Sequence, residues 1–121
     1  MENKEFSRKL EERTKVFALK IIRLSALLPS SVEGKIIRNQ MTKSGTSIGA
    51  NYREAVRARS RADFKSKIKI CESEASETNY WIEIIAELKW IDLKELDETM
   101  TESDELLAIF ASIGKSLNSF D

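Results

Sequence analysis

The sequence contains no histidine at any of its 121 positions. This absence excludes Ser-His-Asp triads, zinc sites with histidine ligands and the Glu-x-x-His ligands of di-iron bundles. Cysteine is nearly absent as well, because Cys71 stands alone. A single cysteine excludes a disulfide framework and a cysteine metal site. We therefore predict a protein without catalytic residues, metal or cofactor, which is not an enzyme.

Proline and glycine are also scarce, with one proline and four glycines. So little turn material favours helices over a sheet of many short strands. No run of about 18 apolar residues predicts a transmembrane helix, and residues 1–15 lack the apolar core of a signal peptide. We expect one domain over residues 1–121, located in the cytoplasm and without membrane contact.

Apolar and small residues recur at steps of three and four in four segments, which is the spacing of one helical face. In the second segment the predicted buried stripe is Ile37, Met41, Ser44, Ile48, Asn51, Ala55 and Ala58. In the third it is Phe64, Ile68, Cys71, Ala75, Thr78, Ile82 and Ile85. Pro29 ends the first segment, Ser31 and Ser60 can cap the second and third, and Asp92 precedes the fourth. The predicted helices cover residues 4–28, 32–58, 61–89 and 93–117. Four helices of this length with short connections predict an all-α fold, an antiparallel up-down-up-down four-helix bundle.

Two of these helices have alternatives. The small residues 44–50 include Gly45 and Gly49, each costing about 1 kcal/mol relative to alanine. They predict either the close approach of another helix or a loop between two shorter helices. In the fourth segment Leu106, Ile113 and Phe120 form one apolar line. The polar residues Thr101 and Ser103 allow a shorter helix that begins at about residue 103.

The net charge of zero hides a strong asymmetry along the chain. Residues 1–34 carry net +2, residues 35–69 carry 10 basic and 2 acidic side chains, net +8, and residues 70–121 carry net −10. One interpretation is that helix faces of opposite sign neutralise each other when they pack. The other is a basic surface that binds nucleic acid beside an acidic surface.

The predicted nucleic-acid-binding residues gather around the connection between the second and third helices. They are Lys43, Arg53, Arg57, Arg59, Arg61, Lys65 and Lys69. Arginine binds phosphate bidentately, and the lack of interleaved aromatic residues argues against base stacking. Binding is therefore expected to be electrostatic, with low sequence specificity. Solvated charges at a helix end are the alternative.

The acidic residues of the third helix, residues 72–87, are scattered around it, which argues against a metal or acid–base site. We expect Glu74 and Glu77 to form ion pairs with Arg53 or Arg57, within one bundle or between bundles. Cys71 lies on the apolar stripe and is predicted to be buried. Adjacent residues point about 100° apart on a helix, so of Tyr80 and Trp81 we expect one in the core and the other at a subunit contact.

Three linked motifs resemble the bacterial four helix bundle protein family, which includes proteins encoded in intervening sequences of large-subunit ribosomal RNA genes. The motifs are Ser44-x-x-Ser47-Ile48-x-x-Asn51-x-x-Glu54-Ala55, Arg59-Ser60-x-x-Asp63-Phe64 and Glu74-Ala75-Ser76-Glu77-Thr78-x-Tyr80-Trp81. The resemblance covers nearly the whole chain. It implies a bundle that assembles into a ring-shaped homopentamer and has no enzymatic activity. In more distant relatives, the accessory variability proteins of retroelements, it implies a basic surface that binds nucleic acid and a reverse transcriptase.

From this sequence we predict a non-enzymatic, oligomeric helical bundle that binds RNA or DNA through its basic surface. The alternative is a scaffold for protein interactions, for example beside a reverse transcriptase, without nucleic-acid binding of its own.

Overall fold

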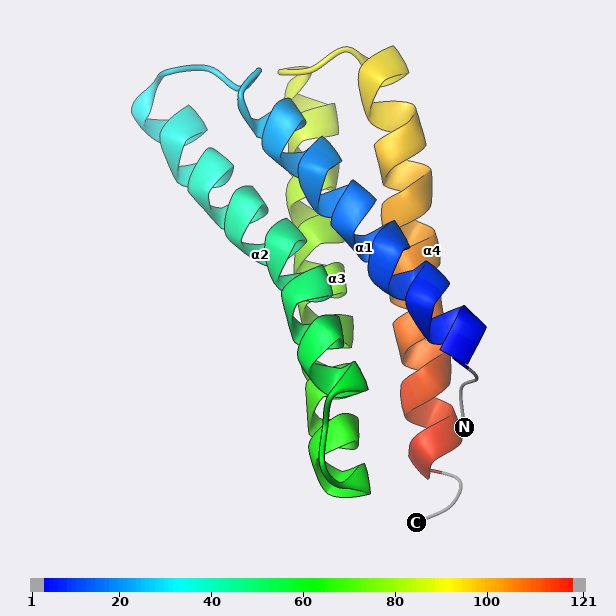
Figure 1. Ribbon diagram of the computed structural model, residues 1–121. Coiled ribbons are helices and arrows are strands. Elements are labelled where there is room, and N and C mark those ends of the chain that lie inside the picture. The colour runs from blue at the N-terminus through cyan, green and yellow to red at the C-terminus, as the bar shows by residue number, and fades with distance from the viewer. Residues whose placement is uncertain (1–3, 119–121) are drawn as a thin grey trace.

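A computed structural model describes residues 4–118 of the chain, and this part consists of helices without any strand. Successive helices run in opposite directions, so that their connections alternate between the two ends of the molecule (Figure 1). Each helix packs against the next along the chain, and the first also meets the fourth. The predicted four-helix bundle is confirmed. Its helices are α1 (Lys4–Ser25), α2 (Val32–Val56), α3 (Arg61–Leu88) and α4 (Leu93–Asn118).

The expected caps begin α2 and α3. The hydroxyl oxygen of Ser31 accepts a hydrogen bond from the backbone N–H of Gly34 at 3.0 Å, and that of Ser60 accepts one from Asp63 at 3.0 Å. Each bond satisfies one of the N–H groups that a helix leaves unpaired in its first turn. The two helices begin at the positions that the sequence predicts.

The predicted C-terminal ends were wrong by one to three residues. α1 ends at Ser25 instead of residue 28, where backbone bonds tighten to a spacing of three residues. The guanidinium group of Arg38 donates to the carbonyl oxygens of Ser25 and Leu28, at 3.0 and 2.8 Å. This side chain from α2 therefore satisfies carbonyls that the end of α1 leaves free. α3 ends before Lys89, which adopts the left-handed conformation with φ 58°.

The core contains the predicted apolar stripes, with one important change in α2. Tyr52 is fully buried, whereas its neighbour Asn51 is half-buried and donates to the backbone oxygen of Ser47 at 2.9 Å. The Tyr52 ring meets Phe110 of α4 edge to face, with ring centroids 5.6 Å apart. The predicted stripe placed Asn51 on the buried face, which was wrong. The buried residues of α3 follow its predicted stripe: Ile68, Cys71, Ala75, Thr78, Ile82 and Ile85.

The small residues of α2 bring α1 close. A Cβ atom added at Gly45 would lie 2.8 Å from the Ile21 side chain, and one at Gly49 would lie 3.1 Å from Thr14. α2 is continuous through this segment. The prediction of a close helix approach is therefore confirmed, and the alternative of a loop was wrong. α4 is continuous too, so the shorter fourth helix was also wrong.

Ion pairs join α1 to α4. The Arg13 guanidinium binds Glu102 at 2.6 and 2.8 Å and also contacts Glu105, and Lys20 pairs with Glu98.

No helix within residues 4–118 is long and apolar enough to cross a membrane. Phe120, predicted to extend the apolar line of the fourth helix, lies outside the described residues.

Candidate nucleic-acid interface

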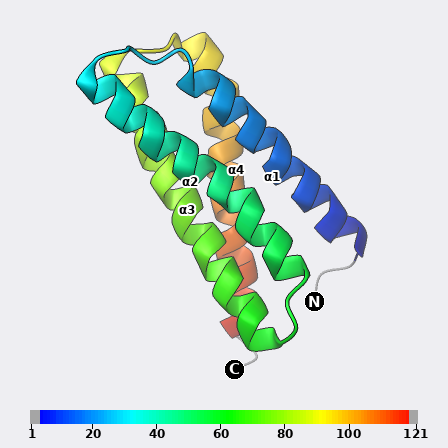
Figure 2. The same cartoon turned by 60° about the vertical axis from the view of Figure 1, so that its left-hand side comes forward.

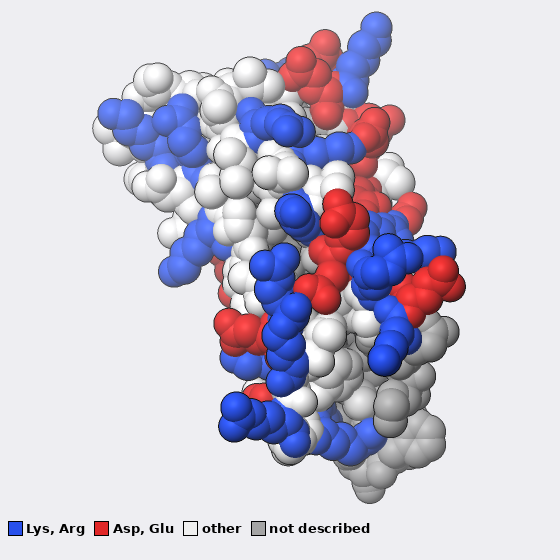
Figure 3. Space-filling view, in the orientation of Figure 1, with Lys and Arg blue, Asp and Glu red and all other residues white. Residues whose placement is uncertain are grey.

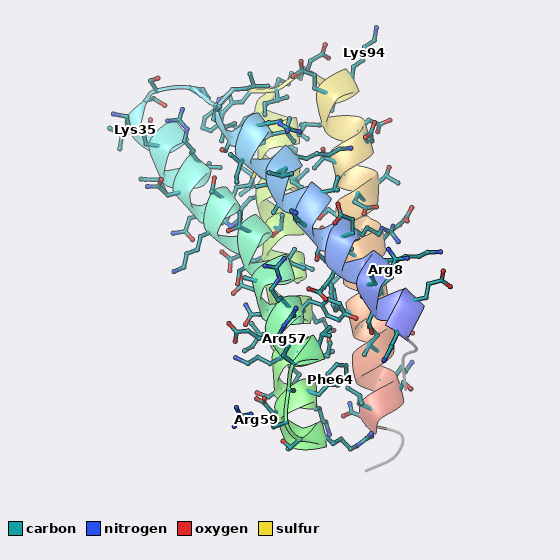
Figure 4. The ribbon with its side chains drawn as sticks, in the orientation of Figure 1. Arg8, Lys35, Arg57, Arg59, Phe64 and Lys94 are labelled. Atoms are coloured by element: carbon teal, nitrogen blue, oxygen red, sulfur yellow. The ribbon has the colours of Figure 1, made fainter. Side chains whose placement is uncertain are left out.

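The short α2–α3 connection places several arginines at one end of the bundle. Figure 4 shows Arg57 where α2 ends and Arg59 in the connection, at the end of the bundle where α1 begins. Figure 2 shows the same connection from a second side, where it runs from the end of α2 down to the start of α3. In Figure 3, Lys and Arg side chains form a band over the lower half of α2 and onto this connection. Lys35 and Lys94 lie at the opposite end of the molecule (Figure 4).

Arg53 and Arg57 lie one helical turn apart and share a carboxylate of α1. Glu11 Oε2 is 3.4 Å from Arg53 Nε and 3.5 Å from Arg57 Nη1. The two arginine side chains are 61% and 63% exposed. One carboxylate facing two guanidinium groups leaves a net positive charge. The contacts are long for charge-assisted hydrogen bonds, so both guanidinium groups can also donate to a phosphate.

Lys15 joins this surface from α1, and sequence reasoning missed it. An open groove between α1 and α2 is lined by Lys15 and Arg53, by the carboxylates of Glu11 and Glu54, and by small residues such as Gly49 and Ala50. Glu54 is paired with Lys67 at 2.7 Å. The signal was weak, since Lys15 merely follows Glu11 by four residues on one helical face. Only the crossing of α1 over the glycines of α2 brings Lys15 beside Arg53. We call Lys15, Arg53, Arg57 and Arg59 the basic face.

The other predicted site residues lie elsewhere on the bundle. Arg61 donates from Nη2 to the carbonyl oxygen of Leu117 at 2.7 Å, so it helps to cap α4. Lys65 and Lys69 line a groove between α3 and α4. Lys43 lies about three turns before Arg53 in α2. Its positive charge there opposes the rise in the pKa of Glu74. The structure thus brings Arg53, Arg57 and Arg59 together and separates Lys43, Lys65 and Lys69 from them.

Within one bundle, the acidic residues of α3 have other roles than the predicted pairing. Glu11 is there the ion-pair partner of Arg53 and Arg57, instead of Glu74 or Glu77, and pairing between bundles stays a prediction. Glu77 accepts a hydrogen bond from the Trp81 indole at 3.0 Å, and burial raises the pKa of Glu74. Within residues 4–118, no group of histidine, cysteine or acidic side chains is arranged to hold a metal ion.

Cys71 is buried as predicted, and of the aromatic pair Trp81 is the residue that packs against the core. Cys71 is fully buried, and desolvation raises the pKa of its thiol to about 12, so the thiolate is strongly disfavoured at neutral pH. Trp81 packs against the core while Tyr80 is 54% exposed, with ring centroids 5.1 Å apart. The assignment of Tyr80 to a subunit contact stays a prediction.

The chain matches a sequence model of the 23S rRNA-intervening sequence protein family over residues 6–112. Among solved structures it is similar to a protein of unknown function from the S23 ribosomal protein family of Bacteroides thetaiotaomicron VPI-5482. The two share 36% sequence identity with a TM-score of 0.80, and the similarity covers 87% of this chain and 97% of that chain. No curated protein matches the chain.

Proposed function

Because this chain belongs to the 23S rRNA-intervening sequence protein family, we propose that it is a non-enzymatic bundle protein that assembles from identical copies and binds nucleic acid. The observation that carries this proposal is the basic face, where exposed arginines from two turns of α2 and the following connection lie beside Lys15. The proposed site of action is the cytoplasm, and the proposed ligand is the phosphate backbone of RNA or DNA.

The chemistry of the basic face supports backbone contacts over base recognition. Guanidinium groups bind phosphate oxygens in pairs, whereas stacking on bases needs aromatic side chains. The basic face contains no aromatic residue. Affinity would therefore come from charge neutralisation and depend weakly on sequence.

Neutralising the basic face should weaken binding to all sequences alike. If the assembly contacts about six phosphates of duplex DNA, log affinity falls with log salt with a slope near −5. The variant Arg53→Gln/Arg57→Gln/Arg59→Gln removes three charges per copy, so its slope should be shallower by at least about 2 to 3. Fluorescence anisotropy with labelled RNA and DNA, from about 50 to 200 mM salt, measures both slopes.

The matched control is Lys35→Gln/Lys94→Gln, which removes two charges at the opposite end of the bundle. This control should keep the wild-type slope, and circular dichroism should show native helix content in both variants. If wild type does not bind at low salt, or if the triple variant keeps its slope, the basic face is not a nucleic-acid site.

The proposed assembly is a homopentamer, the number that the family resemblance implies. Exposed apolar side chains of α1 support an assembly, because Val16, Leu19 and Ile22 are 43%, 42% and 47% exposed. Multiple copies of the basic face would also add avidity. Light scattering coupled to size exclusion should give five times the 13.8 kDa chain mass. A stable monomer at micromolar concentration would contradict the assembly.

A protein-interaction scaffold is the second candidate function, with a reverse transcriptase or another protein as the partner. It is favoured by apolar side chains at the end away from the basic face, such as Val32, 71% exposed, and Leu93, 61% exposed. Absence of salt-dependent binding to RNA and DNA, with the fold and the mass intact, would favour this candidate.

A further inference from the structure

A shallow groove, largely open to solvent, runs along the outer surface between α3 and α4. Its larger part, about 830 Å³, is lined among others by Lys69, Glu77, Tyr80 and Leu107. Its continuation toward the start of α3 is lined by Lys65 and other residues, and the two parts share Lys69, Glu72 and Ala111. Four of the residues that line the groove are small: Ser73, Ser76, Ala111 and Gly114. We call these four residues the floor of the groove.

The charged side chains of this groove follow an order along its length. Lys65, Lys69 and Lys115 line the end where α3 begins. Two carboxylates follow along α3, Glu72 about one turn after Lys69 and Glu77 beside Tyr80 at the other end. A helix lying in the groove would therefore be bound best with an acidic residue at the lysine end, a basic residue at the glutamate end and apolar residues between them.

The outer face of α1 has this same order of side chains. Glu12, Val16, Leu19 and Arg23 follow steps of four and three, so they lie on one face of the helix, and all four are exposed. From Glu12 to Arg23, and from Lys69 to Tyr80, the chain advances by eleven residues. Both distances are therefore about 16 Å at 1.5 Å per residue. This places Arg23 level with Tyr80, and Glu77 lies about one turn earlier, roughly 12 Å from Lys69.

We propose that the α3–α4 groove of one copy binds the outer face of α1 from a second copy. Glu12 then meets Lys69, Val16 and Leu19 cover the small residues of the floor, and Arg23 meets Glu77 beside the Tyr80 ring. This contact deepens the proposed assembly of identical copies and is independent of nucleic-acid binding. It assigns Lys69 to a subunit contact instead of a phosphate contact.

Helix direction supports the same partner. The charge order requires the docked α1 to run parallel to the α3 that it meets, because the reverse direction would place Arg23 against Lys69. In the bundle, α1 and α3 run in the same direction (Figure 1). Copies related by a rotation axis along the bundle keep their equivalent helices parallel, so the charge order and a cyclic assembly agree.

One chain is unable to fill its own groove. Among residues 4–118 of one copy, α1 lies beside α2 and α4 and not beside α3. The contact therefore joins two different surfaces of neighbouring copies, which is the heterologous type that closes into rings.

Exchanging the charges of one pair tests the contact. Lys69→Glu and Glu12→Lys each create a like-charge contact, and each should raise the dissociation constant of the assembly at least about tenfold. The double variant Glu12→Lys/Lys69→Glu recreates an opposite-charge pair and should recover the wild-type mass. Light scattering during dilution, without nucleic acid, measures the masses, and Lys94→Glu at the far end of α4 is the control that should change nothing.

A substitution of Arg8 is expected to strengthen the assembly, whereas the charge reversals at Glu12 and Lys69 weaken it. Arg8 lies one turn before Glu12 on α1 (Figure 4), so in the docked arrangement it comes level with Lys65, one turn before Lys69. This is a like-charge contact. Arg8→Glu should therefore lower the dissociation constant, whereas a role of Arg8 outside the contact would leave it unchanged.

A cysteine pair tests the geometry directly. In Leu19→Cys/Ser76→Cys, mild oxidation should link successive copies and give a ladder of covalent oligomers on a non-reducing gel. Each single-cysteine variant should give no ladder, and Cys71 stays in place because it is buried. An oligomeric wild type with unaffected charge variants or no ladder would overturn this contact alone. A monomeric wild type would overturn the assembly as well, and neither result bears on nucleic-acid binding.

Discussion

Replacing Phe110 by alanine is expected to lower the free energy of unfolding by about 3 to 5 kcal/mol. Phe110 of α4 is fully buried and packs edge to face on Tyr52 of α2. The substitution removes the apolar area of a whole ring and leaves a cavity in the middle of the core, where surrounding helices relax only partly. It also removes the aromatic pair itself, which contributes about 0.5 to 1.5 kcal/mol beyond area.

Urea unfolding followed by circular dichroism measures this loss. Phe110→Leu is the matched control, because it also removes the aromatic pair but keeps most of the apolar volume, so it should cost clearly less than the alanine variant. All variants are compared at one protein concentration, since assembly adds to the apparent stability. A loss below about 1 kcal/mol for the alanine variant would contradict the close packing of α4 on α2 at this level.

The second large effect is expected at Gly34, where alanine should destabilise the protein by about 2 to 3 kcal/mol. A Cβ atom at this position would lie 2.0 Å from the carbonyl oxygen of Pro29 and 2.8 Å from its carbonyl carbon. These are backbone atoms, so the α1–α2 connection must shift as a whole. The shift would disturb the buried Leu28 and the hydrogen bond of Arg38 to its carbonyl.

Alanine has a higher helix propensity than glycine by about 1 kcal/mol, so the expected destabilisation is what remains after this gain. Gly114→Ala in α4 is the matched control. There the nearest atom to the added Cβ would be Glu72 Oε1 at 3.6 Å, which is ordinary contact. This control should stabilise the protein by about 0.5 to 1 kcal/mol. Because Gly114 also lines the α3–α4 groove, both variants are compared at a dilution at which the copies have separated. If Gly34→Ala is as stable as wild type in urea unfolding, the connection does not pack against Gly34 as described.

Local patterns in the sequence were enough to predict the class of fold and the start of each helix. Pro29 and the caps at Ser31 and Ser60 act on backbone groups only a few residues away. The stripe of α3 from Ile68 to Ile85 was predicted in full because its steps of three and four repeat without interruption. The resemblance to a family rested on the linked motifs, and the family match over residues 6–112 confirms it.

The burial of Tyr52 instead of Asn51 needed the tertiary structure. Either position can lie on the buried face of α2. With 3.6 residues per turn, steps of three or four residues do not return to the same angle, so neighbouring positions can both fit the stripe. The choice depends on which neighbour has space for a ring, and Phe110 of α4 provides that contact.

The arrangement of charges also depended on tertiary structure, because it follows from how each helix is rotated and where two helices cross. Glu11 and Lys15 reach Arg53 because α1 crosses α2 at Gly45 and Gly49, and no pattern within α1 indicates that crossing. For the same reason the basic residues of segment 35–69, which carries net +8, lie on different surfaces of the bundle. Three of its arginines form the basic face, while Lys65 and Lys69 line the α3–α4 groove. Sequence determined the helices and their total charge, and packing decided which charges meet.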